Sequence, residues 1–100
     1  MDNSTKFRVG SQSIITTATA EQLPNIIVVN GKAIVIKARD TNTGDIYFGH
    51  SKAIVESHEF ELAPGESVEI FTDNLNDVWV DVAVNGEYVE WLLEVPYGTT

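Results

Sequence analysis

Two acidic residues, Asp81 and Glu90, would form a carboxylate pair if the segments that carry them folded against each other. Between them lies Asn85-Gly86, a dipeptide typical of two-residue β-hairpin turns. In that register Asp81 falls directly opposite Glu90, with their Cβ atoms about 5 Å apart. Glycosidases use two carboxylates roughly 5–10 Å apart, but those acids line a cleft. A flat sheet face on a small domain offers no such cleft, so we predict that the chain is not an enzyme.

The same hairpin register predicts an aromatic-rich patch around the two acids, on the face opposite the core. Aromatic residues with charged neighbours are typical of protein interfaces. We expect the acids to be solvated or to meet a cation from the chain itself or from a partner. The predicted interface consists of Trp79, Asp81, Tyr88, Glu90, Leu92, Lys37 and Arg39. An alternative is that the N-terminal segment of the same chain covers this face.

The histidines, serines and remaining acidic residues do not occur in the spacing that a catalytic triad or a metal site requires. His50 precedes Ser51 and His58 follows Ser57, but sequence neighbours do not make a catalytic triad. Residues 40–45 resemble a calcium loop only in passing, because the glycine is fifth and a serine stands at the twelfth position. There is no cysteine. We therefore predict no catalytic residue, no cofactor and no metal.

The elements that must position these residues alternate apolar and polar side chains with a period of two. Residues predicted to be strands are 13–19, 26–29, 32–39, 46–49, 60–62, 67–71, 78–84 and 87–93. A type II turn is predicted at residues 63–66, and a loop with a possible edge strand at 50–59. The predicted core face of the last two strands holds Val78, Val80, Val82, Val89, Trp91 and Leu93. Short strands with turn signals about every 8–12 residues predict an all-β fold, an antiparallel β-sandwich of jelly-roll or Ig-like type with about 7–8 strands.

Length and charge limit the possibilities further. One hundred residues predict a single domain, 1–100, with a loose N-terminal arm at 1–8 and a C-terminal tail at 97–100. The first 52 residues carry six basic and four acidic residues, whereas the other 48 carry eleven acidic residues and no lysine or arginine. Such an acidic chain is not expected to bind nucleic acid, and no apolar run predicts a membrane span. The asymmetry is consistent with a solvated surface. The alternatives are an acidic face that binds a basic partner, or charge pairing between copies of the chain.

Several segments occur in an order that resembles a known family. They are TATAEQLP (17–24), VIKA (35–38), NTGDIYFGHS (42–51), LAPGES (62–67), NL (74–75), VDV (80–82) and NGEYVEW (85–91). This series resembles the small β-sandwich virion proteins of tailed bacteriophages, which occur as head decorations or fibres and in necks or tails. The resemblance covers residues 17–91, and its segments are turn-and-strand signatures that specify fold better than role.

The resemblance implies a structural protein present in many copies on the virion after synthesis in the host cytoplasm. Its partner would be the major capsid protein or another virion protein, and a homo-oligomer, which we take to be a trimer, is expected. One alternative is a neck or tail adaptor. Another is a ligand-binding module that recognises carbohydrate on a host surface, with Trp79 and Tyr88 as a stacking platform.

Overall fold

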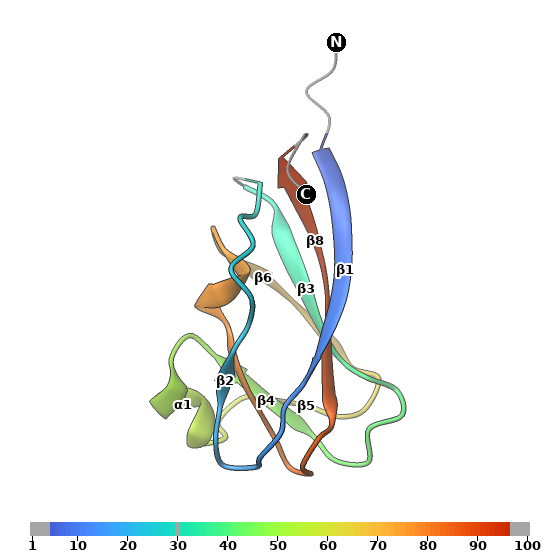
Figure 1. Ribbon diagram of the computed structural model, residues 1–100, viewed down its shortest axis with the longest axis vertical. Helices are drawn as coiled ribbons and strands as arrows, with labels where there is room; N and C mark the ends of the chain where they lie inside the picture. Colours follow the sequence, from blue (N-terminus) through green and yellow to red (C-terminus); the bar gives the residue numbers. More distant parts are fainter. Residues whose placement is uncertain (1–4, 30, 97–100) are drawn as a thin grey trace.

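The computed structural model describes residues 5–29 and 31–96, which fold as two antiparallel sheets packed face to face (Figure 1). The predicted arm at 1–8 and tail at 97–100 therefore lie partly or wholly outside the described residues. The elements are β1 (Thr5–Ser13), β2 (Glu21–Gln22), β3 (Ala33–Ala38), β4 (Ile46–Gly49), α1 (Lys52–Glu56), β5 (Glu61–Leu62), β6 (Ser67–Phe71), the 3-10 turn η1 (Leu75–Asp77), β7 (Trp79–Val82) and β8 (Tyr88–Pro96).

The strand order identifies the sandwich as a jelly roll. One sheet has the order β1-β8-β3-β6 and the other β2-β7-β4-β5. Strand β1 pairs with β8, β2 with β7, β3 with β6 and β4 with β5. These nested antiparallel pairs are what results when one long hairpin is rolled into two sheets, which is the jelly-roll form of an all-β domain. The predicted β-sandwich is confirmed, and the topology decides for the jelly roll.

The apolar alternation correctly predicts which side chains form the core. The inward residues of β3 (Ile34, Ile36 and Ala38) have no exposed surface. The six predicted core residues of the last two strands are likewise buried and belong to one cluster. The turn at residues 63–66 also forms as predicted, because Gly65 adopts φ +87° and Glu66 N–H donates to the carbonyl of Ala63 at 2.9 Å. A positive φ at this position is what a type II turn requires.

The predicted hairpin around Asn85-Gly86 is wrong in its pairing. Strand β7 lies in one sheet, between β2 and β4, and β8 lies in the other, between β1 and β3. The turn itself forms, since Glu87 N–H bonds the carbonyl of Val84 at 3.3 Å. The chain then crosses to the facing sheet, so that the apolar sides of β7 and β8 meet across the core instead of sharing one face. Asp81 therefore does not lie opposite Glu90.

Four local predictions in the first 59 residues are also corrected. The predicted strand at 26–29 forms only an isolated bridge, between Ile27 and Asn74. Residues 5–8 are not a loose arm, because β1 pairs residue by residue with β8 from Thr5 to Ser13. Residues 13–19 were predicted to be a strand, but β1 already ends at Ser13. In the turn that follows, Ala18 adopts a positive φ of 64°. The loop at 50–59 contains a short helix instead of an edge strand. Ser51 caps it by accepting the N–H of Ile54 at 3.3 Å.

The helix α1 covers part of the outer face of the β2-β7-β4-β5 sheet. It contacts β4 and β7, and its Val55 is buried there (Figure 1). Within residues 5–29 and 31–96, no helix has the length and hydropathy needed to cross a membrane. The outer face of the β1-β8-β3-β6 sheet carries no such covering helix among the described residues.

Candidate functional site

Five of the seven residues predicted to form an interface lie on or beside the outer face of the β1-β8-β3-β6 sheet. Val89, Trp91 and Leu93 of β8 are buried, so the alternate residues of that strand point outward. The outward set from β8 and β3 comprises Tyr88, Glu90, Leu92, Lys37 and the adjoining Arg39. Trp79 and Asp81 belong to the other sheet. The structure thus brings most of the predicted interface together without the hairpin that predicted it.

Arg39 links the charged part of this face. Its Nε lies 2.9 Å from a carboxylate oxygen of Glu90, and its guanidinium carbon lies 3.9 Å from the centre of the Tyr88 ring. Each charged side chain of the pair is about one-third exposed. From the sequence, Glu90 was expected to be solvated or to meet a cation from Lys37, Arg39 or a partner, and in the structure it meets Arg39. The ion pair and the cation–π contact together hold the arginine side chain in one position. The ion pair also largely balances the local charge.

Apolar side chains continue across the same sheet face. We call these residues the apolar band: Phe7, Val9, Leu92, Val35 and Phe71. Val9 pairs with Leu92, which in turn pairs with Val35, so these three form one row across β1, β8 and β3. Phe7, Val9 and Phe71 are more than 70% exposed and Leu92 is 40% exposed. Glu94 lies on the same face beside Phe7. Several exposed apolar side chains on one face usually mark an interaction site.

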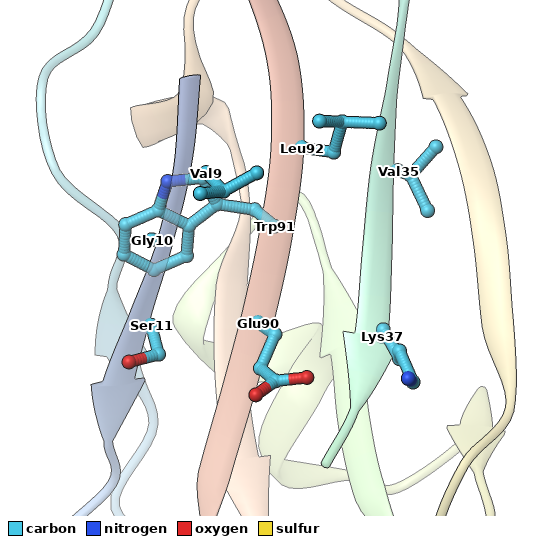
Figure 2. Close-up of a pocket in the computed structure, with 8 residues that line it drawn as sticks. All are labelled: Val9, Gly10, Ser11, Val35, Lys37, Glu90, Trp91 and Leu92. Atoms are coloured by element: carbon cyan, nitrogen blue, oxygen red, sulfur yellow. The ribbon is translucent and has the colours of Figure 1, made fainter. Parts of the chain in front are cut away.

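A shallow hollow of about 570 Å³ lies within this face (Figure 2). Val9, Leu92 and Val35 border it on one side, and Glu90 and Lys37 border it on the other. The Trp91 ring reaches from β8 across to β1 at Gly10 (Figure 2). The hollow thus joins aliphatic side chains to a few charged groups, which resembles the apolar centre and polar rim of a protein interface.

Four members of the apolar band were not predicted from the sequence, namely Phe7, Val9, Val35 and Phe71. A signal for the first two was present, because Phe7 and Val9 alternate with Lys6 and Arg8. Such alternation is typical of a strand with one apolar face. The prediction of a loose arm over residues 1–8 concealed it.

Asp81, in contrast, is a structural acid. Its side chain has no exposed surface, and one of its oxygens lies 2.8 Å from Nε2 of His58. The other oxygen accepts the N–H of Val82 at 2.8 Å. The His58 ring stacks on Tyr47, with ring centres 3.8 Å apart and planes 8° from parallel. A fully buried acid cannot contact a partner or a substrate in this state, so the predicted interface role of Asp81 is wrong.

Tyr47 lies among acidic groups on this second sheet. Burial raises the pKa of Tyr47, and the charges of Asp45, Glu61 and Asp81 raise it further. A hydrogen bond with Asp45 raises the pKa of Glu61. No group of three or more His, Cys, Asp or Glu side chains in the described part of the chain is arranged to hold a metal ion.

Trp79 lies on the outer side of β7, because its neighbours Val78 and Val80 are buried in the core. Tyr88 lies on the outer side of β8, in the facing sheet. The two rings therefore point away from each other, and the predicted stacking platform of Trp79 with Tyr88 does not form.

Comparison with protein-family models, curated proteins and solved structures finds no match to this chain. Its function must be argued from the surface itself.

One further polar cluster joins the β3–β4 loop to the start of β8. Asn42 is buried and forms two hydrogen bonds with the backbone of Tyr88, at 2.8 and 3.1 Å. The Glu87 carboxylate accepts the N–H groups of Thr43 and Gly44 and the hydroxyl of Thr43. Residues 40–45, which resembled a calcium loop, thus use Asn42, Thr43 and Gly44 to bind their own chain.

Acid should weaken this cluster through Glu87. Burial alone would raise the pKa of Glu87, but its hydrogen bonds from Thr43 and Gly44 lower it below 4.5 overall. A lowered folded-state pKa adds stability above the unfolded-state value, and this stability is lost as pH falls through the folded-state value. We expect Glu87→Gln to reduce the free energy of unfolding at pH 7 by about 1 kcal/mol. The difference from wild type should narrow below about pH 4.5.

Urea unfolding at pH 7 and at a series of acidic pH values measures this difference. Glu69→Gln is the matched control, since Glu69 is an exposed glutamate on β6. The same stability loss in both variants, or a loss for Glu87→Gln that stays constant down to the lowest pH, would contradict the role given to the Glu87 carboxylate.

Proposed function

We propose that this chain is a non-enzymatic structural protein of a tailed-bacteriophage virion, of the capsid-decoration or head-fibre type. It binds the major capsid protein or another virion protein through the apolar band. The observation that carries the proposal is the band itself, where four large apolar side chains are 40–73% exposed on one sheet face. Exposing this surface to water is unfavourable, and burying it against a partner recovers about 25 cal/mol per Å² of apolar area.

The two faces of the sandwich differ in a way that supports docking through the band. On the second sheet, α1 and His58 cover the outer side of β4 and β7. On the first sheet, the band lies open beside the Arg39–Glu90 pair. An apolar centre with charged groups at its margin is the usual anatomy of a protein interface. The charged margin would then set the orientation of the docked chain.

The placement of the acids supports a non-enzymatic role. Asp81 is buried against His58, and Glu90 is paired with Arg39 in the other sheet. The carboxylate pair considered from the sequence is therefore absent. The carbohydrate alternative loses its stated platform in the same way, because Trp79 and Tyr88 lie on opposite sides of the sandwich.

We expect Leu92→Asp to reduce particle binding at least tenfold, because it places a charge at the centre of the band. A tenfold loss corresponds to about 1.4 kcal/mol, which is small for a central interface residue. The measurement is co-sedimentation of the purified chain with particles of its phage that lack it, using separated heads and tails. Binding to heads supports a decoration or head-fibre protein, whereas binding only to tails would overturn that part and favour an adaptor.

Ile15→Asp is the matched control, because Ile15 is a similarly exposed aliphatic residue (64%) outside the sheets. Thermal unfolding establishes that both variants remain folded. If Leu92→Asp bound particles as tightly as the wild type and the control, the band would not be the docking surface. If the wild-type chain bound neither heads nor tails, the virion proposal would be overturned.

A further inference from the structure

The two edges of the β1-β8-β3-β6 sheet carry opposite charge. Strand β1 contains Lys6 and Arg8 and no acidic residue, whereas residues 66–73, which include β6, contain three acidic residues and no basic one. Among the described residues β1 and β6 are the outermost strands of this sheet. Outermost strands present N–H and C=O groups on their free side and readily pair with another strand.

The strand directions allow one edge to pair with the other. Each neighbouring pair in the sheet is antiparallel, so β1 runs in the same direction as β3 and opposite to β6. A second copy placed beside β6 in the same orientation therefore presents its β1 antiparallel to β6. The antiparallel ladder continues from one copy into the next without any reversal of the subunit.

The register across the sheet also brings two exposed aromatic side chains together at the two edges. Val9, Leu92, Val35 and Glu69 form one continuous row from β1 to β6. In a copy displaced along this row, Phe7 faces Phe71, since each lies two residues from the row on the same side. Phe7 is 72% exposed and Phe71 is 73% exposed. Cross-strand aromatic pairs stabilise sheets, and this pair would extend the apolar band from copy to copy.

A groove beside β6 suits the opposite face of an added β1. The groove has a volume of about 450 Å³, and its lining includes Phe60 and Ile70 as well as the acidic Glu59 and Asp77. On β1, Arg8 points away from the side of Phe7 and Val9 and is exposed. In the register above, Arg8 lies opposite Ile70, beside these acids. Hydrogen bonds between a guanidinium and carboxylates are among the strongest in proteins.

We propose that copies of this chain associate head to tail, with β1 of one copy pairing antiparallel with β6 of the next. The inference rests on the proposed function in supposing many copies, and it names their mutual contact. Because the two surfaces differ, the contact is heterologous, and it produces a closed ring or an open filament. A trimer, which the resemblance to virion proteins led us to expect, is one such ring.

Two single variants test the contact in solution, without any particle. Phe7→Asp blocks the β1 edge and leaves β6 intact, while Phe71→Asp blocks β6 and leaves β1 intact. In sedimentation equilibrium, wild type should form a multimer of the 11.0 kDa chain, and each variant alone should be monomeric. An equimolar mixture of the two variants should form a one-to-one dimer and stop there, because only one productive edge pair remains.

Each alternative gives a different result that would overturn the proposal. Assembly of Phe71→Asp alone would indicate β1–β1 pairing, and assembly of Phe7→Asp alone would indicate β6–β6 pairing. A mixture that stays monomeric, or a wild-type chain that is monomeric at every concentration, would exclude edge pairing. Ile15→Asp should assemble as wild type does. Failure here leaves particle docking to its own test, because Leu92→Asp is assayed by binding to heads.

Discussion

Truncating Trp91 to alanine is expected to lower the free energy of unfolding by about 4 kcal/mol, the usual cost of removing a large aromatic side chain from a core. Trp91 is only 7% exposed and belongs to the main core cluster. Its ring lies against β1 at Gly10, which pairs with it across the strands (Figure 2). The residue therefore joins β1 to the sheet as well as filling the core.

Gly10 is expected to be necessary for the same contact. A Cβ atom at this position would lie 2.7 Å from ring carbons of Trp91, which is closer than atoms pack. Replacing glycine by alanine in a strand usually gains about 0.5–1 kcal/mol. The clash should outweigh that gain, because overpacking a core costs about 1–3 kcal/mol. We expect Gly10→Ala to be destabilising by about 1–2 kcal/mol net.

Urea unfolding of the single and double variants tests this coupling. Gly10→Ala combined with Trp91→Leu should lose less stability than the two single losses added together, because the smaller residue relieves the clash. Ser11→Ala, at the next and exposed position of β1, should be close to neutral. Additive losses in the double variant would mean that Gly10 and Trp91 do not constrain each other.

The sequence predicts the strands and core of this domain well wherever apolar alternation decides. Strands β4 and β6 match their predicted bounds, and β3 matches to within one residue at each end. Alternation is a local property, and it states which side chains are buried regardless of what covers them. The six apolar core residues of the last two strands were therefore predicted correctly although the strand pairing was not, whereas the burial of Asp81 was not predicted.

Pairing between distant segments could not be predicted in the same way. The dipeptide Asn85-Gly86 indicates a turn, but it does not specify whether the next strand joins the same sheet or the facing one. Strand β1 pairs with β8, more than 70 residues away along the chain, and no local signal identifies that partner. Predicting the candidate surface required knowing both which sheet β8 joins and that β1 pairs with it. The outward residues of β8 were predicted, whereas Phe7 and Phe71 become part of the surface only through the topology.

Replacing His58 by alanine is expected to lower the free energy of unfolding by about 3 kcal/mol, because it leaves the carboxylate of Asp81 buried without its charged or polar neighbour. Asp81 has no exposed surface, and the His58 ring both bonds it and stacks on Tyr47. His58 maintains these contacts with a positive φ of 57°, an unusual conformation for a residue other than glycine. Such backbone strain persists only when surrounding contacts maintain it.

Thermal and urea unfolding of His58→Ala measure the loss, and His50→Ala is the matched control, since His50 is an exposed histidine in the same loop region. Adding Asp81→Val to His58→Ala should recover stability, because it replaces a buried carboxyl group that has lost its partner with an apolar side chain. If the double variant were as unstable as the two single variants added together, the two residues would not act as a pair.

The contacts of Asp81 with His58 indicate a role in stability, not in catalysis. A catalytic acid must reach a substrate, whereas this carboxylate is enclosed and used within the fold by His58 and the N–H of Val82. Asp81→Asn should therefore reduce stability by about 1 kcal/mol and leave particle binding unchanged, because the apolar band lies on the other sheet. Loss of particle binding by a folded Asp81→Asn protein would contradict this division between the two faces. The acid that first suggested chemistry would then have to be placed back in the functional surface.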